Sequence, residues 1–234
     1  MYRFESRIRF SEVDETGHLT IASVINYFQD CTIFHAEEVG LGIEHYARIH
    51  KIWVLSTWQI QVNRFPKVCE KVTITTYPYA FKGFLGYRNF TITDEKGDIC
   101  IVADSTWVYL DTLQNRPSRI IPLDVEPYGT LFKLEMDYKK GKIQLESNMD
   151  KLEPLPVLPS YVDGNHHMNN SQYVNIAQKY LPDFFYPTHL RVEYRNAAKE
   201  GDILYPMIYS SESRCVVVLA DEDEKPYAVM EFVS

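Results

Sequence analysis

Two stretches of this chain repeat one another, and this internal duplication limits the fold more than any other feature. VDETGHLTIASVIN begins at Val13 and VDGNHHMNNSQYVN begins at Val162, an offset of 149 residues (162 minus 13). Both stretches have valine, aspartate, histidine and asparagine at the same four places. Such self-similarity indicates a repeated supersecondary unit. We therefore expect two repeats that share one architecture.

Each stretch predicts an amphipathic helix. In the first repeat the helix follows Thr20, a residue type that caps helices, and Gly40 marks its end. Pro182 marks the end of a shorter helix in the second repeat. The apolar positions recur at the helical period: Ile21, Val24, Ile25 and Phe28 in the first helix, and Tyr173, Ile176, Ala177, Tyr180 and Leu181 in the second.

Runs rich in β-branched and aromatic residues follow each helix and predict antiparallel strands. They are WVLSTWQIQV, KVTITTYPYAF, FLGYRNFTIT and DICIVADSTWVYL in the first repeat, and HLRVEYR, DILYPMIYS, CVVVLA and PYAVMEFV in the second. An amphipathic helix must bury its apolar stripe, and the nearest partner is the concave face of its own sheet. The predicted class is α+β, with a sheet wrapped around one helix in each repeat.

The segment between the repeats sets the predicted domain boundaries. RPSRIIPLDVEPYG (116–129) and the polar KKGKIQLESNMDKLEPLP (139–156) are typical of a connection. We predict an N-terminal repeat over residues 1–130, a linker over 131–156 and a C-terminal repeat over 157–234. The DEK turns at 94–96 and 223–225 are 129 residues apart (223 minus 94), 20 fewer than the helix starts. The extra residues of the first repeat should lie in its helix and the following loop.

Charge and composition argue against several classes of partner. The 24 basic and 32 acidic residues give a net charge of −8, which is unfavourable for binding nucleic acid or an anionic membrane. No run reaches the ~18 apolar residues of a membrane span, and the charged N-terminus is unlike a signal peptide. The four cysteines form no C-x-x-C pair, so we expect no zinc site, no disulfide framework and a cytoplasmic location.

The second helix opens with the pattern D-x-N-x-H-x-N-N-x-x-Y, in which six of eleven positions are fixed. Its residues are Asp163, Asn165, His167, Asn169, Asn170 and Tyr173; VEYR follows at 192–195, and WVYLDTLQNRPSRI stands at 107–120 in the first half. With the duplicated order of helix and strands, this pattern resembles the bacterial-type acyl-(acyl carrier protein) thioesterases, which have a tandem double hot-dog fold. The likeness covers nearly the whole chain.

The resemblance implies an activity, a partner and a set of catalytic residues. The activity is hydrolysis of fatty acyl thioesters carried on the phosphopantetheine of acyl carrier protein, which ends chain elongation and releases free fatty acid. The catalytic positions map onto Asp163, Asn165 and His167. No metal or other cofactor is implied, and related thioesterases make a homodimer a reasonable expectation.

The chain departs from the plant-type family pattern directly after VEYR. That pattern continues with Arg-Glu-Cys, whereas Asn196, Ala197 and Ala198 stand here. A mechanism that needs this glutamate, or a cysteine nucleophile beside it, is not open to this chain.

The residue types at the remaining positions suit thioester hydrolysis, which needs an activated water, a stabilised oxyanion and a proton for the departing thiolate. We expect Asp163 to activate water and Asn165 to hold that water or the substrate carbonyl. Histidine moves protons near neutral pH, which gives His167 the third task. Free N–H groups at the start of the following helix would stabilise the oxyanion.

The first repeat carries Asp14, Thr16 and His18 at the matching positions, with Thr16 in place of the amide. We expect this repeat to have lost catalysis and to shape the acyl tunnel with its longer helix.

Structural interpretations compete with the catalytic ones. Asp and Asn ahead of a helix are most often caps. The duplicated context favours chemistry for Asp163 and Asn165, and we assign Asn169 and Asn170 as caps.

Other polar residues near the motif also have structural interpretations. Adjacent side chains rarely converge on one metal ion, and no third ligand lies at helical spacing, so we expect no metal at His166 and His167. His166 is interpreted as a surface or packing residue. Glu193 and Arg195 are interpreted as a cross-strand pair, and Glu193 is kept as a second candidate for an active-site carboxylate.

Three other functions remain open at this stage. They are hydrolysis of acyl-coenzyme A, dehydration of a hydroxyacyl chain by a hot-dog dehydratase, and acyl binding without catalysis. An acidic carrier protein would require a local basic patch on this acidic chain. The candidates are Lys139, Lys140 and Lys142, or Arg191, Arg195 and Lys199.

Overall fold

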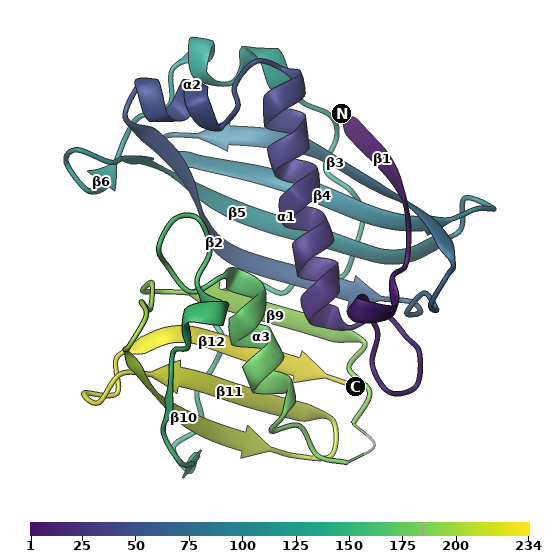
Figure 1. Cartoon of the computed structure of the whole chain (residues 1–234), viewed down its shortest axis with the longest axis vertical. Helices are drawn as coiled ribbons and strands as arrows, with labels where there is room; N and C mark the ends of the chain where they lie inside the picture. The colour runs from purple at the N-terminus through teal and green to yellow at the C-terminus, as the bar shows by residue number, and fades with distance from the viewer. Residues whose placement is uncertain (184) are drawn as a thin grey trace. The chain divides into compact units, whose positions relative to one another are not determined.

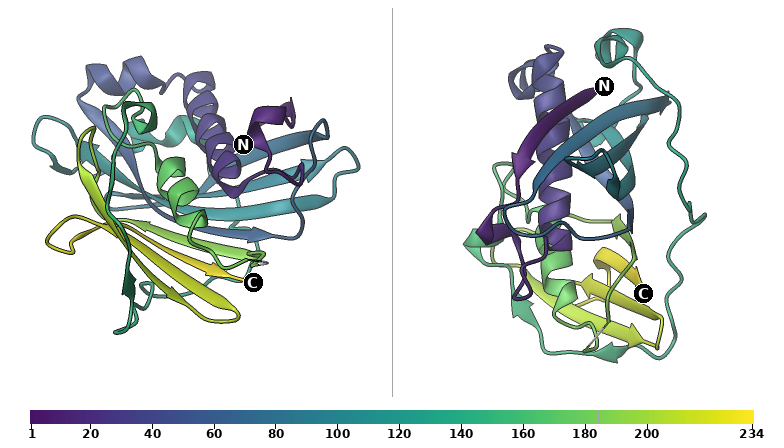
Figure 2. Two further views of the ribbon diagram at one scale, coloured as in Figure 1. Left: turned by 60° about the horizontal axis from the view of Figure 1, so that its bottom comes forward. Right: turned by 90° about the vertical axis from the view of Figure 1, so that its right-hand side faces the viewer.

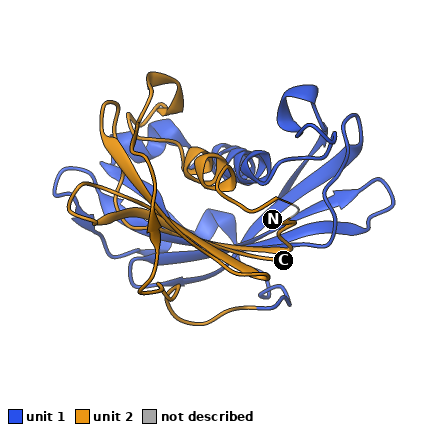
Figure 3. Cartoon of the chain, turned by 90° about the horizontal axis from the view of Figure 1, so that it is seen from below, with its two compact units in different colours: residues 1–137 blue, residues 138–234 orange. Residues whose placement is uncertain are grey.

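The computed structural model describes residues 1–183 and 185–234, which form two compact units (Figure 3). Unit 1 spans Met1–Asp137 and unit 2 spans Tyr138–Ser234. Each unit contains one copy of the duplicated stretch together with the strands that follow it. The division falls inside the segment 131–156 that we expected to link the repeats.

The sheet of unit 1 is antiparallel throughout. Its strands lie in the order β1 (Tyr2–Arg7), β3 (Lys71–Lys82), β4 (Leu85–Asp94), β5 (Ile99–Asp111) and β2 (Lys51–Val62), and the short β6 (Arg116–Pro117) pairs with β5. The strands β2 to β5 were predicted, whereas β1 was not. Arg88 lies opposite Ser105 and Asn89 opposite Asp104, so these consecutive side chains point to opposite faces.

Helix α1 (Ile21–Glu38) lies along the inner face of this sheet (Figures 1 and 2). The Thr20 side chain accepts a hydrogen bond from the Ser23 N–H, which confirms the predicted cap. The Phe28 ring lies 4.9 Å from the Phe90 ring and 5.7 Å from the Trp58 ring, measured between centroids. All four predicted apolar positions are buried, so the helix stripe and the sheet form one core.

The sheet of unit 2 is also antiparallel. Its strands lie in the order β9 (His189–Tyr194), β12 (Pro226–Val233), β11 (Arg214–Ala220), β10 (Ile203–Ser210) and β7 (Asp150–Lys151), and β8 (Leu155–Pro156) pairs with β10. Helix α3 (Asn170–Gln178) has nine residues against 18 in α1 and contacts β11 and β12 (Figure 1). The longer first helix was predicted.

The end of α3 differs from the prediction. The helix ends at Gln178, four residues before Pro182. The N–H groups of Lys179 and Tyr180 bond to carbonyls three residues back, which tightens the last turn before proline is reached.

The remaining helices are short. They are α2 (Ile43–Arg48) and the 3₁₀ turns Phe10–Glu12, Pro122–Asp124, Glu126–Tyr128 and Pro159–Tyr161. No helix in the described part of the chain is long and apolar enough to cross a membrane. The prediction of α+β units, each with one helix packed on an antiparallel sheet, is confirmed.

Candidate active site

The D-x-N-x-H part of the motif in unit 2 forms a tight loop directly before α3. Val162 and Met168 form an isolated β-bridge that closes the loop. Inside it, the Asp163 N–H donates to the His167 carbonyl over 2.9 Å, and the Asn165 N–H donates to Asp163 Oδ1 over 2.8 Å. The loop therefore gathers the three predicted catalytic residues on one short turn.

The start of α3 is capped by one asparagine. Asn169 Oδ1 accepts hydrogen bonds from both the N–H and the hydroxyl of Ser171, each over 2.9 Å, which confirms Asn169 as the cap. Asn170 is the first helical residue, so its prediction as a cap is wrong. The Gln172 N–H donates to the Asn169 carbonyl. Because the Ser171 and Gln172 N–H groups already have partners, the helix start is less open to an oxyanion than we expected.

The predicted catalytic side chains differ in exposure. Asp163 and His167 are half-buried, whereas Asn165 and His166 are exposed. Apart from the bond between the Asn165 N–H and Asp163 Oδ1, none of these four side chains hydrogen-bonds within residues 1–183 and 185–234. His166 is a surface residue, as predicted, and has a φ of +60°. The Asn165 amide and the His167 ring therefore stay available to a bound molecule.

A buried tyrosine holds the segment after VEYR against this loop. The Ala198 N–H donates to the Tyr173 hydroxyl over 2.9 Å, and the Met168 N–H donates to the Ala198 carbonyl over 2.8 Å. Burial raises the pKa of Tyr173 to about 12, and the nearby carboxylates of Asp202 and Asp163 contribute. The exposed Ala197, where the family pattern has glutamate, thus lies on a segment tied to the loop.

This contact of Tyr173 was not predicted, because the sequence assigned the residue only to the core. The available signal is that the matching residue of the first repeat (173 minus 149) is Val24, which has no hydroxyl. When a buried position has a polar side chain in one repeat and an apolar one in the other, the polar side chain is expected to have a hydrogen-bond partner in its own repeat.

Glu193 and Arg195 form an ion pair, but the pair joins the end of β9 to the residue after it rather than two strands. The Arg195 guanidinium approaches Glu193 Oε2 to 2.8 Å, while the residue opposite Glu193 on β12 is Val229. Glu193 Oε1 accepts a hydrogen bond from the Ile143 N–H over 2.6 Å. The cross-strand prediction is therefore wrong, and both carboxylate oxygens of Glu193 are occupied.

The matching loop of unit 1 has the same backbone and a closed set of side chains. Asp14 Oδ1 accepts hydrogen bonds from the Thr16 hydroxyl (2.7 Å), the Thr16 N–H (2.9 Å) and the His18 N–H (3.0 Å). His18 Nδ1 lies 2.8 Å from the same hydroxyl. Burial acts to raise the pKa of Asp14, but these hydrogen bonds outweigh it and hold that pKa below its ordinary value.

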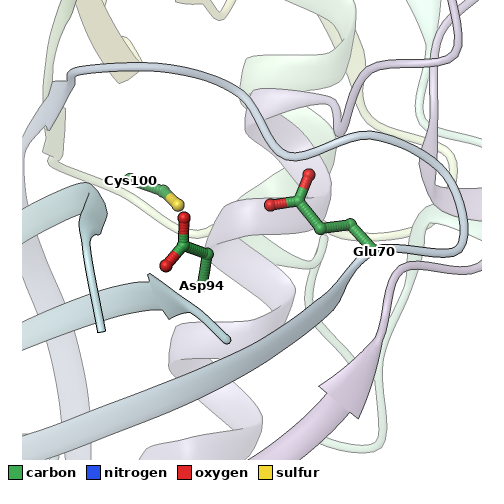
Figure 4. Close-up of side chains that lie close together, drawn as sticks. All are labelled: Glu70, Asp94 and Cys100. Atoms are coloured by element: carbon green, nitrogen blue, oxygen red, sulfur yellow. The ribbon is translucent and has the colours of Figure 1, made fainter. Parts of the chain in front are cut away.

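One further cluster, outside both loops, has a composition that could suit a metal. The side chains of Glu70, Asp94 and Cys100 converge in unit 1 (Figure 4). Arg64 already bridges the two carboxylates, at 2.6 Å from Glu70 and 2.8 Å from Asp94, and burial raises the pKa of the Cys100 thiol to about 11. The guanidinium supplies the positive charge, so the cluster is an ion-pair network.

Known proteins are similar to this chain in sequence and in fold. Residues 1–128 match the family model of the acyl-ACP thioesterase N-terminal domain. A chloroplastic acyl-(acyl carrier protein) hydrolase of Cuphea viscosissima is 26% identical over 220 residues, which cover 87% of this chain and 53% of that protein. The chain spans about half the length of the curated relatives it matches.

Solved structures extend the likeness over the whole chain. An acyl-ACP thioesterase from Bacteroides thetaiotaomicron matches with a TM-score of 0.91 and 22% identity, covering 99% of this chain and 96% of the other. The 12:0-ACP thioesterase from Umbellularia californica matches with a TM-score of 0.87 and 23% identity over the same shares. At these identities the likeness shows the fold, and the predicted hot-dog fold is confirmed.

Proposed function

This chain belongs to the acyl-ACP thioesterase family, and on that basis we propose that it hydrolyses fatty acyl thioesters of acyl carrier protein. The products are a free fatty acid and the carrier with its free thiol. The observation that carries this proposal is the open loop of unit 2. That loop also carries the Asp163 carboxylate. The Asn165 side-chain amide and the His167 ring have no hydrogen-bond partner among the described residues.

In the proposed reaction, Asp163 acts as the base that activates a water molecule for attack on the thioester carbonyl. One of its oxygens is held by the Asn165 N–H, which fixes the carboxylate on the loop. The Asn165 amide can donate and accept at once, so it orients that water or the carbonyl. His167 delivers a proton to the departing thiolate.

The oxyanion is assigned to loop N–H groups rather than to the start of α3. The N–H groups of Gly164 and His167 have no partner among the described residues, whereas those of Ser171 and Gln172 are bonded. Preorganised N–H donors of this kind stabilise a developing negative charge without reorganising.

The proposed partner is an acidic carrier protein, which requires basic side chains that are free to meet it. Arg191 is paired with Glu231 over 3.0 Å, and Arg195 is paired with Glu193. Lys140, Lys142 and Lys199 are exposed and have no ion pair among the described residues. These three lysines are therefore the preferred contacts from our two candidate groups.

A cytoplasmic location and a homodimer complete the proposal. All four cysteines are free thiols, which suits a reducing compartment. The homodimer rests on the family resemblance.

The test is release of thiol from dodecanoyl and hexadecanoyl chains carried on acyl carrier protein and on coenzyme A. Asp163→Asn should lower the rate by roughly 10²- to 10⁴-fold, the usual contribution of a positioned base, with folding retained. Asp14→Asn, the same substitution in the first loop, is the matched control and should leave the rate close to that of the native protein.

The products distinguish the alternative functions. A free acid and a thiol support hydrolysis, and faster release from the carrier protein than from coenzyme A supports the proposed substrate. An enoyl thioester would identify a dehydratase, and acyl binding without thiol release would identify a binding module. Equal losses in Asp163→Asn and Asp14→Asn would contradict the division of labour between the loops.

A further inference from the structure

Unit 1 contains a small cavity beside a buried arginine, in a part of the molecule to which the proposed reaction assigns no chemistry. The cavity has a volume of about 30 Å³, and its wall includes Trp53, Phe81, Gly86, Arg88, Trp107 and Tyr128. A water molecule needs roughly 10–15 Å³ of such space, so the cavity has room for two waters or for one small polar group.

The guanidinium of Arg88 lies in this wall with little contact to solvent. Arg88 is 6% exposed. Its Nη2 lies 2.7 Å from His35 Nδ1, its Nη1 lies 3.5 Å from the Thr76 hydroxyl, and its Cζ lies 5.2 Å from the centroid of the Tyr128 ring. These contacts use two of the five N–H donors that a guanidinium has.

No carboxylate among the described residues pairs with Arg88. His35 cannot supply a negative charge, because imidazole is either neutral or cationic. Burial and the charge of Arg88 lower the pKa of His35 to about 3, so the ring is neutral and Nδ1 accepts the hydrogen bond. A buried cation without a counter-charge is costly, and this cost is offset when an anion binds beside it.

We propose that the Arg88 cavity binds a carboxylate group at the end of an apolar chain. A carboxylate has two oxygens that can bond to a guanidinium in parallel, and three N–H donors of Arg88 remain for it. The volume suits a single carboxylate. Trp53, Phe81 and Trp107 supply an aromatic wall for adjoining methylene groups.

Two kinds of molecule carry such a group. One is a free fatty acid, which is the product of the proposed reaction. The naming of either source rests on the proposed function, whereas the carboxylate site itself does not. The other is an acyl chain with a second carboxylate at its far end. Both molecules would present a carboxylate to Arg88. In the free fatty acid it is the acid group that hydrolysis releases, whereas in the second molecule it lies at the far end of a thioester substrate.

Binding is measured on the whole protein by titrating dodecanoate and dodecanol, with tryptophan fluorescence and calorimetry as readouts. Trp53 and Trp107 line the cavity and report directly on its occupant. We expect dodecanoate to bind roughly 10- to 100-fold more tightly than dodecanol, the range for a hydrogen bond to a charged group. Arg88→Met should abolish this difference, while Arg7→Met, which removes an exposed charge from β1, should preserve it.

A second variant tests the cavity without changing the charge. A Cβ atom at Gly86 would lie 2.9 Å from the Trp53 ring, so Gly86→Ala should push the ring and weaken dodecanoate binding with Arg88 retained. This variant decides the matter if Arg88→Met does not fold. Equal affinities for dodecanoate and dodecanol in the native protein, or full dodecanoate binding in the variants that fold, would overturn the proposal.

Thiol release separates the two sources. If the chain end is recognised, the native protein prefers a pantetheine thioester with a terminal carboxylate over plain dodecanoyl pantetheine, and Arg88→Met loses that preference. If only the free acid is recognised, both thioesters react alike and dodecanoate binding alone depends on Arg88. Asp163→Asn should bind dodecanoate normally, because the carboxylate site does not depend on the proposed catalysis. A native protein that releases no thiol but binds dodecanoate through Arg88 would contradict the proposed function and leave the carboxylate site supported.

Discussion

The loops at 13–19 and 162–168 have the same backbone and opposite side-chain chemistry. In both, the aspartate N–H donates to the histidine carbonyl, over 2.8 Å in the first loop and 2.9 Å in the second. In the first loop Thr16 joins Asp14 to His18 through one hydroxyl. In the second loop Asn165 makes no such link. The residue at this position, threonine or asparagine, thus determines whether a side-chain hydroxyl bridges the acid and the histidine.

If catalysis is confined to the second loop, as we propose, the first loop has kept its backbone and lost its chemistry. The single hydrogen of the Thr16 hydroxyl is donated to Asp14 Oδ1. The hydrogen bond between that hydroxyl and His18 Nδ1 therefore has the Nδ1–H as its donor. Asp14 Oδ1 and His18 Nδ1 then both have partners within the loop. A substrate would have to break these bonds to use them, whereas in the second loop the Asn165 amide and the His167 ring have no hydrogen-bond partner among the described residues.

The largest expected effect comes from making the second loop like the first. In Asn165→Thr the new hydroxyl should bond Asp163 and His167, as Thr16 bonds Asp14 and His18. We expect thiol release to fall by roughly 10²- to 10³-fold, the cost of losing one positioned donor. Steady-state kinetics with a carrier-bound substrate measures the change.

The reciprocal substitution is the control. Thr16→Asn opens the first loop and should leave the rate of thiol release nearly unchanged, because no chemistry is assigned there. A comparable loss in both variants would mean that the two loops act together and that their difference in bonding has no functional meaning.

The second effect concerns the buried hydroxyl of Tyr173, which unit 1 lacks at the matching position, Val24. Tyr173→Phe leaves the Ala198 N–H without its partner, which should cost about 1–3 kcal/mol in the free energy of unfolding. Urea unfolding followed by circular dichroism measures this loss. Tyr180→Phe is the matched control, since the Tyr180 hydroxyl has no hydrogen-bond partner among the described residues. Equal losses in the two variants would show that the Ala198 contact does not hold the segment.

The sequence predicted those parts of the molecule whose information is local. The apolar period of α1 and the β-branched runs of β2 to β5 are each readable from adjacent residues. Strand β1 was missed because YRFESR alternates charged residues with half-buried ones and lacks an apolar run. A strand of this composition is specified by its pairing with β3, which lies about 70 residues away (71 minus 2 is 69).

The site shows the same division between local and distant information. Asp163, Asn165 and His167 could be proposed from the sequence because they occupy one short motif and a repeat of it. The bond between Tyr173 and Ala198 joins residues 25 positions apart, and the contact of Arg88 with His35 joins residues 53 apart. Neither pair has a local spacing that could reveal it, so only the packed structure shows these contacts.

A smaller effect concerns the pH dependence of stability that Asp14 contributes in the first loop. The folded pKa of Asp14 is lowered, so Asp14 contributes stability above its unfolded pKa of about 3.9 and loses that contribution as the pH falls through the folded value. Asp14→Asn should therefore be less stable than the native protein at pH 7 by less than about 1 kcal/mol, since the group is exposed. Urea unfolding as a function of pH should show this gap close below about pH 4. A gap that persists into strong acid would assign the stability to packing rather than to charge.

The smallest effect tests whether the two loop backbones are truly equivalent. Gly17 has a φ of +78° and the matching His166 has a φ of +60°, a conformation that costs a side chain roughly 1 kcal/mol. His166→Gly relieves this strain but gives the unfolded chain more freedom, worth roughly 0.5–1 kcal/mol, so we expect stabilisation of only a few tenths of a kcal/mol. His166→Ala keeps the strain and should show no gain in thermal unfolding. If glycine and alanine behaved alike, the second loop would not share the left-handed turn, and its open side chains would then reflect a different backbone rather than the change from threonine to asparagine.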